Sequence, residues 1–127
     1  GFSLYPHHLK DKSDCTLESF CEMVARTAEL MNVDNLGFGS DLCQDQPDSV
    51  VQWMRNGRWT RDTDYGEGSE KQEGFPNQPD WFRDNRDFEN ILGGLRNVGF
   101  SAEEIEHIAG LNWLNFFERS FRPVAGS

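Results

Sequence analysis

The chain has 127 residues, which is enough for one domain with a hydrophobic core and tight for two. Its 12 Lys and Arg residues stand against 22 Asp and Glu residues, and a net charge of −10 disfavours nucleic acid and anionic membranes as partners. The sequence has no apolar run of about 18 residues, so we expect neither a membrane span nor a signal peptide.

The first third of the chain is predicted to form a strand, a helix and a second strand. Residues 1–6 are rich in β formers and end at a proline, as a strand does where it enters a loop. Thr16 is a typical helix N-cap. Apolar residues follow it at spacings of three and four and predict an amphipathic helix: Leu17, Phe20, Cys21, Val24, Ala28 and Met31. A short strand is predicted over 36–41, and this order indicates a parallel βαβ unit.

A long polar segment follows at about 42–84. It is crowded with Gly, Pro, Asp, Asn and Gln and is interrupted by aromatic residues. Irregular segments of more than about 15 residues in compact domains tend to be functional lids or disordered linkers. The aromatic content favours an ordered excursion, and a decoration without catalytic function remains the alternative.

Helices are predicted for the rest of the chain, at about 87–121. Asp87 is placed to cap the first of them, and Gly99 to end it. Ser101 and Glu104 match a capping box, in which each side chain accepts a hydrogen bond from the backbone of the other residue. A second, short helix is therefore expected to begin there.

The last predicted helix covers residues 111–121. Gly110 is expected to divide it from the helix before it. Its apolar residues are too many for a single stripe: Trp113, Leu114, Phe116 and Phe117. We therefore expect this helix to be buried on more than one side.

The cysteines and histidines offer no complete metal site. Cys15, Cys21 and Cys43 form an odd set without a C-x-x-C pair, which favours a reducing, cytoplasmic setting and small buried thiols at the first two positions. The adjacent residues His7 and His8 would point to opposite faces of a strand, and no acidic residue stands at a spacing that completes a metal site with them. A third histidine, within an acidic helical turn, is expected on the solvated surface: His107.

Asp41 is the strongest catalytic candidate because of its position. In parallel α/β barrels the catalytic groups project from the C-terminal ends of strands, and this carboxylate stands at the C-terminal end of the strand predicted over 36–41. It could serve as a general base or as a ligand on the metal side. An aspartate after a strand is also a common turn residue or helix cap, and that interpretation stays open.

Two motifs and the order of the segments carry a family resemblance. The first motif is Gly-Phe-Gly-Ser-Asp at 37–41, and the second is the stretch 99–117, with Gly110, Asn112 and the pair Phe116-Phe117. A Gly-Phe-Ser-Leu-Tyr strand, a His-Leu segment and an amphipathic helix precede them. Over nearly the whole chain, this order resembles the C-terminal third of the membrane (renal) dipeptidases, a family of zinc peptidases.

The resemblance implies an α/β fold in which residues 1–127 form the C-terminal segment of a single hydrolase domain. This segment would supply about the last two βα units of a TIM-like (β/α)8 barrel. The family hydrolyses small dipeptides with a water activated by two zinc ions, whose ligands come from earlier strands. None of those ligands is expected in this chain, so the fragment alone would be an inactive part of a metallo-dipeptidase.

The resemblance also assigns roles to two residues. Asp41 would lie close to the metals and handle the proton of the attacking water, and Tyr5 would line the substrate cavity. Family members often continue after this aspartate with Phe or Leu and then Asp-Gly, whereas Leu42, Cys43 and Gln44 stand here. That departure leaves Asp41 in place and puts a second acidic contact in question.

The resemblance also leads to an expectation about what surrounds the cleft. We expect the long acidic loop, with Trp53, Arg58 and Trp59, to cover one side of it. The C-terminal residues 122–127 form no apolar tail for a lipid anchor, so an unanchored protein is expected.

Two strands and their helices cannot close a barrel, so the upstream part of the same protein is the expected partner besides the dipeptide. A homo-oligomer is also possible. The alternatives are a non-catalytic acidic interaction module built as a self-sufficient helical bundle, and an inactive barrel relative.

Overall fold

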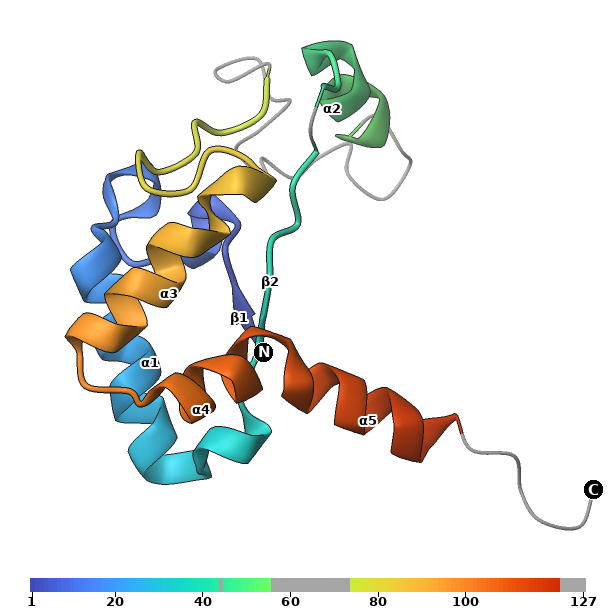
Figure 1. Cartoon of the computed structure of the whole chain (residues 1–127). Helices are drawn as coiled ribbons and strands as arrows, with labels where there is room; N and C mark the ends of the chain where they lie inside the picture. Colours follow the sequence, from blue (N-terminus) through green and yellow to red (C-terminus); the bar gives the residue numbers. More distant parts are fainter. Residues whose placement is uncertain (44, 56–73, 122–127) are drawn as a thin grey trace, which may run out of the picture.

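The computed structural model describes residues 1–43, 45–55 and 74–121. Its helices and strands, shown in Figure 1, are β1 (Phe2–Ser3), α1 (Leu17–Met31), β2 (Phe38–Gly39), α2 (Asp48–Arg55), α3 (Phe88–Asn97), α4 (Ala102–Glu106) and α5 (Asn112–Ser120). Short 3-10 turns occur at Pro6–His8, Lys12–Asp14, Val33–Asn35 and Asn85–Asp87, and a π-helical turn at His107–Leu111. Within these ranges, no helix is both long and apolar enough to cross a membrane.

The two strands and the helix between them form the predicted parallel βαβ unit. β1 pairs with β2 so that Phe2 stands opposite Phe38, and Ser3 opposite Gly39. The backbone N–H of Leu4 donates to the carbonyl oxygen of Gly39 at 3.0 Å and extends the ladder by one bond. Both strands are shorter than predicted. The first gives way to the turn at Pro6–His8, where a proline in the first turn suits the fixed φ of its ring.

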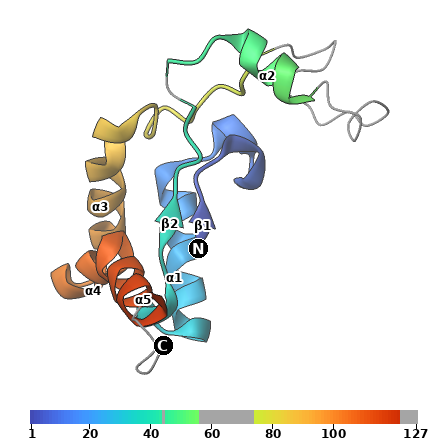
Figure 2. The ribbon, with the colours of Figure 1, turned by 90° about the vertical axis from the view of Figure 1, so that its right-hand side faces the viewer.

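The helices cover one face of the strand pair. In Figures 1 and 2, α1 and α3 lie on the same side of β1 and β2, and the opposite face is turned towards the viewer in Figure 2. Phe2 points towards α1, where its ring lies 6.2 Å from that of Phe20. Because side chains alternate along a strand, Ser3 and Gly39 point to the other face. Both are small, and Gly39 is exposed.

The core lies between α1, α3 and the strands. Thr16 caps α1 as predicted, because its hydroxyl accepts a hydrogen bond from the backbone N–H of Ser19 at 3.1 Å. Of the predicted apolar face of α1, Phe20, Cys21 and Val24 are buried, Leu17 and Ala28 are partly buried, and Met31 at its end is 54% exposed. The fully buried residues at the centre of the core are Leu4, Phe20, Cys21, Val24, Phe82, Ile91, Leu95 and Ile108.

Two of the three cysteines are buried as expected. Cys15 and Cys21 are free thiols inside the core, whereas Cys43 is exposed. Burial, with a smaller contribution from the neighbouring Cys15, raises the pKa of Cys21 to about 11. This thiol is therefore protonated at neutral pH and acts as a small apolar group.

Close packing of α1 on α3 depends on one glycine. A Cβ added to Gly94 would lie 2.7 Å from the Cys21 sulfur and 2.9 Å from Cγ of Leu17, so the two helices approach more closely than an alanine would allow. A Cβ added to the neighbouring Gly93 would meet nothing within 4 Å. Gly94 is thus closely packed, whereas the adjacent Gly93 has open space where a Cβ would stand.

We expect alanine to have opposite effects at these two positions. Gly94→Ala should lower the free energy of unfolding, because overpacking costs about 1–3 kcal/mol and outweighs the gain in helix propensity. Gly93→Ala should raise it by about 0.5–1 kcal/mol, because only the helix-propensity gain applies. Urea denaturation of both variants measures the difference, and equal effects would contradict the close contact of α1 with α3.

The predicted loop at about 42–84 differs from an irregular segment in two places. α2 occupies Asp48–Arg55, and the end of the segment enters the core. The indole N–H of Trp81 donates to the carbonyl oxygen of Cys15 at 2.6 Å, and its ring lies 5.3 Å from that of Phe20. Phe82, directly after it, is completely buried. These contacts join residues 66 positions apart, which periodicity along the chain does not reveal.

The start of α3 differs in detail from the prediction that Asp87 caps it. Asp87 makes no side-chain cap on α3. Instead, Asp84 caps the preceding 3-10 turn, and Asp87 accepts the reciprocal bonds of that capping box. The physical reason is that the helical backbone begins one turn earlier, as a 3-10 turn at Asn85–Asp87.

The start of α4 is as predicted, but Gly110 does not divide the final helices. Ser101 and Glu104 form the capping box, and Gly99, with φ +105°, ends the helix before it. Gly110 lies inside the π-helical turn that joins α4 to α5, whose flanking residues keep right-handed helical dihedrals. A π-helical turn contains one more residue than an α-helical turn and keeps the helical path, so the helix continues through Gly110.

The prediction that the last helix is buried on more than one side was wrong for this chain. α5 has no buried residue, and Figure 1 shows it extending away from the other helices. Its large apolar side chains are exposed from 39% at Trp113 to 52% at Leu114, and Phe121, directly after the helix, is 77% exposed. They stack mainly on one another, with the rings of Phe117 and Phe121 5.8 Å apart. No other described element reaches the far end of this row.

The first residues of α5 anchor it to the sheet. The side-chain amide of Asn112 donates to the carbonyl oxygens of Val33 and Leu36, each at 2.8 Å, and its oxygen lies 3.0 Å from Nδ1 of His107. His107 is half-buried by this contact rather than solvated as expected. Trp113 covers Gly37 so closely that an added Cβ would lie 2.6 Å from the indole nitrogen.

Candidate functional site

A recess of about 320 Å³ lies beside the C-terminal ends of β1 and β2. Tyr5 and Asp41, the two candidates chosen from the sequence, both line it. Each stands two residues beyond the end of its strand, and parallel strands bring such positions to the same edge of a sheet. Gln78, Arg83 and Asp84 line the recess from the segment that precedes α3.

Asp41, which lines this recess, lies in a bend of the chain with a left-handed backbone. Its side chain is exposed, and its backbone has φ +51°, in the left-handed region that aspartate and asparagine tolerate best after glycine. The turn is supported by Ser40, whose hydroxyl accepts a hydrogen bond from the N–H of Leu42 at 3.5 Å. The carboxylate is therefore open to water and to a small ligand.

Tyr5 is positioned by contacts with its own neighbours. Its backbone N–H donates to the hydroxyl of Ser3 at 3.2 Å. The same hydroxyl lies 2.9 Å from Nδ1 of His8, and the Tyr5 ring packs against His7 and His8 at centroid distances of 5.8 and 5.3 Å. Both histidines lie in the turn at Pro6–His8 rather than on opposite faces of a strand. The two histidine rings therefore support the Tyr5 ring at the side of the recess.

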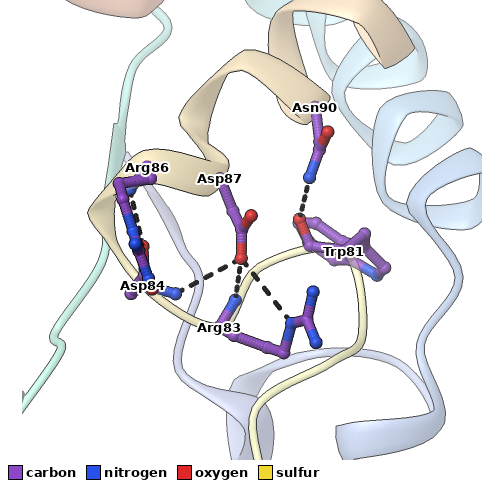
Figure 3. Close-up of polar contacts among 6 residues, drawn as sticks. All are labelled: Trp81, Arg83, Asp84, Arg86, Asp87 and Asn90. Carbon is purple, nitrogen blue, oxygen red and sulfur yellow. Dashed lines mark hydrogen bonds and ion pairs between the residues drawn. The ribbon is translucent and has the colours of Figure 1, made fainter.

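A network of charged residues fixes the segment from 81 to 87, as Figure 3 shows. The Asp87 carboxylate accepts hydrogen bonds from the backbone N–H groups of Arg83 at 2.8 Å and Asp84 at 3.4 Å. The side-chain amide of Asn90 donates to the carbonyl oxygen of Trp81 at 3.0 Å. Because these hydrogen bonds attach the segment to α3, and Trp81 packs partly buried against the core, the backbone that bears Arg83 and Asp84 is fixed beside the recess.

The two arginines of this segment differ in how they are paired. Arg86 binds the Asp84 carboxylate with a contact of 2.5 Å, and its side-chain hydrogen bonds lower the pKa of Asp84 to about 2. The side chain of Arg83 contacts Asp87 through Nε, at 3.9 Å, and is 71% exposed. An exposed ion pair of that length is worth at most about 1 kcal/mol. The guanidinium that lines the recess is thus weakly held.

Gln78 also lines this recess, and its side-chain oxygen is unpaired. Its side-chain oxygen Oε1 is buried and has no hydrogen-bond partner, and among the described residues it is the one such side-chain atom. Leaving a buried acceptor unpaired costs about 1–3 kcal/mol, so a native structure normally retains one only for a reason. Neither Gln78 nor Arg83 could be selected from the sequence, since neither stands in a motif and both lie in the predicted loop.

The described residues do not form a metal site by themselves. Over 1–43, 45–55 and 74–121, no group of three or more His, Cys, Asp or Glu side chains could hold a metal ion. The two zinc ions that the resemblance implies therefore do not fit these residues alone. The acidic side chains of the recess offer proton transfer and hydrogen bonding instead.

The other residues proposed for the cleft cannot be placed. Arg58 and Trp59 lie outside the described residues, and so does the side chain of Trp53. The final part of the same segment, from Phe75 to Asp84, does contribute to the wall of the recess. The expectation that this segment borders the cleft therefore remains a hypothesis for its middle part.

The recess brings together four kinds of group. A carboxylate at Asp41 can accept a proton from water, an arginine at Arg83 can bind an anion, an amide side chain at Gln78 forms part of the wall, and an aromatic ring at Tyr5 forms another part of it. Such a set suits a small polar ligand. Comparison with protein-family models, with curated proteins and with solved structures finds no match to this chain.

Proposed function

We propose that this chain is the C-terminal portion of a zinc dipeptidase of the membrane dipeptidase family, and that Asp41 accepts a proton from the water that attacks the peptide bond. One observation carries the proposal. Tyr5 and Asp41, selected from the sequence for these roles, line one recess at the C-terminal ends of two adjacent parallel strands. In (β/α)8 enzymes this edge of the sheet holds the active site.

The open face of the strand pair favours a barrel over a small closed domain. Parallel sheets are normally covered on both faces, and the described helices α1 and α3 cover one face of β1 and β2. Ser3 and Gly39 on the other face leave room for further packed side chains. Under this proposal, β1 and β2 are two of the eight barrel strands, and the remaining strands belong to another part of the same protein.

The chemistry assigned to the described residues is limited to proton transfer and substrate binding. Zinc ions in such an enzyme would supply a Lewis acid, and their ligands would come from outside these residues. Asp41 would take the proton of the attacking water and pass it to the amine that leaves. A well-placed general base contributes about a hundredfold to ten-thousandfold to turnover.

A second function is favoured by a different observation. The exposed aromatic row of α5 is the kind of surface that binds another protein, and it fits an acidic interaction module, in this case without catalysis. The module needs neither Asp41 nor the recess. The two functions therefore differ in whether the protein hydrolyses dipeptides at all.

The decisive experiment is a hydrolysis assay of the complete protein purified with its metal. We expect it to cleave small dipeptides and to leave a blocked tetrapeptide intact. Removal of the metal with a chelator should abolish cleavage, and added zinc should restore it. If protein that contains two zinc ions per chain cleaves no dipeptide in a broad panel, the dipeptidase proposal is wrong and the interaction module is favoured.

A further inference from the structure

The aromatic row of α5, formed by Trp113, Phe117 and Phe121, starts at the N-terminal ends of the two strands. Trp113 covers Gly1 and Gly37, the residues directly before β1 and β2, so closely that an added Cβ would lie 3.3 and 2.6 Å from its indole ring. Asp41 and its recess lie at the other ends of the same strands. The row therefore belongs to the end of the sheet opposite the candidate active site.

From this contact the row runs beyond the strands. Its rings are stacked at intervals of four residues, and the centroids of each neighbouring pair are 5.8 Å apart. In Figure 1, α5 leads away from α1 and α3, and in Figure 2 it comes forward on the side of the open face of β1 and β2. The row thus projects from the face of the strand pair that α1 and α3 leave open.

The row leaves a large apolar surface uncovered. Its exposed fraction rises from 39% at Trp113 to 77% at Phe121, and Phe116 beside it is 50% exposed. An aromatic side chain can bury roughly 150–250 Å², so these rings form a patch on the order of a few hundred Å², a size that marks a docking surface. A cavity of about 150 Å³ beside Trp113, Phe116 and Gly37 shows that packing at the strand ends is incomplete as well.

A barrel accounts for the place of this row. In a (β/α)8 barrel the helices lie outside, and the strand faces turned away from them form the interior. With α1 and α3 outside, the open face of β1 and β2 is the interior, so α5 crosses below it at the N-terminal ends of the strands. Apolar side chains from all the strands fill such an interior and offer a surface to the aromatic rings. A second copy is a weaker occupant, because each chain carries a net charge of −10.

We infer that α5 closes the N-terminal end of the barrel, and that its aromatic row packs against the N-terminal ends of the strands contributed by the upstream part of the protein. The inference rests on the proposed function, because it takes the barrel from it. The contact of Trp113 with Gly1 and Gly37 is the described beginning of this interface. The interaction module, the second candidate function, then loses the surface that favours it.

The test measures how fast cysteines introduced into the complete protein react with a maleimide. The variants are Phe121→Cys, at the end of the row, and Leu30→Cys as the matched control, since the two positions are 77% and 86% exposed in the described chain. Each rate is divided by the rate of the same variant in denaturing urea, and peptide mass spectrometry separates the label from that on other cysteines. We expect Phe121→Cys to be protected at least about tenfold and Leu30→Cys to be hardly protected. An unprotected Phe121→Cys would overturn the inference.

Phe117→Gln tests the same contact through stability. In the middle of a covered row, the glutamine amide is buried without hydrogen-bond partners and the packing of the ring is lost. The thermal unfolding midpoint of the complete protein should therefore fall by about 5 °C or more, whereas Leu30→Gln should change it by less than about 2 °C. Equal shifts for the two variants would contradict a covered row.

Dilution and activity separate the remaining outcomes. Protection of Phe121→Cys that persists in a monomer supports the inference, whereas protection that disappears on dilution would assign the row to a second copy and overturn it. An unprotected row in a protein that cleaves dipeptides would overturn the inference and leave the dipeptidase in place. A protected row in a protein that cleaves none would support the closed barrel and overturn the proposed activity.

Discussion

Asp41→Asn in the complete protein should lower kcat for dipeptides by about a hundredfold or more, because the amide cannot accept the proton of the attacking water. The fold should survive the change. Asp41 is exposed and has φ +51°, a backbone conformation that asparagine adopts as readily as aspartate. Steady-state kinetics and a thermal unfolding curve, measured on the same preparation, separate loss of chemistry from loss of structure.

Asp11→Asn is the matched control for this variant. Asp11 is also exposed, also has a left-handed backbone with φ +62°, and makes no side-chain cap on the turn that follows it. It does not line the recess. We expect wild-type turnover from Asp11→Asn. Turnover of Asp41→Asn within twofold of the control would remove Asp41 from the mechanism.

Phe82→Ala should be strongly destabilising, with a loss of about 3–5 kcal/mol in the free energy of unfolding. Phe82 is completely buried, and its ring packs edge-to-face on Phe88 at a centroid distance of 5.0 Å. Truncation removes most of the apolar surface of this side chain and leaves a cavity that the surrounding helices fill only in part. Denaturant unfolding of the variant and the wild type measures the difference.

Phe82→Leu is the control at the same site. Leucine keeps much of the buried volume, so the loss should be clearly smaller than for alanine. If Phe82→Ala changed stability by less than about 0.5 kcal/mol, as surface substitutions usually do, then the side chain of Phe82 would be exposed and the buried position would be incorrect.

The elements that could be predicted from the sequence are those whose interactions join residues only a few positions apart along the chain. The N-cap at Thr16 and the capping box of Ser101 with Glu104 form hydrogen bonds between residues three positions apart. The apolar face of α1 follows the helical period directly. Asp41 was expected at a strand end from its position in the sequence, and Tyr5 was expected in the same cavity from the family resemblance; both line the recess.

Tertiary structure alone decided the features that join distant parts of the chain. The bond from Trp81 to Cys15 spans 66 positions, and the one from Asn112 to Val33 spans 79. Such contacts leave no local pattern, so a buried Phe82 looked like part of a loop.

The sequence by itself determined α1, α3, α4, the parallel strand pair and the position of Asp41 at a strand end, because these follow from periodicity and from hydrogen bonds along the backbone. Only the folded chain brought Arg83 and Gln78 into the recess and left the aromatic face of α5 uncovered. The physical reason is that burial depends on which surfaces meet in three dimensions, and no spacing of residues along the chain records that.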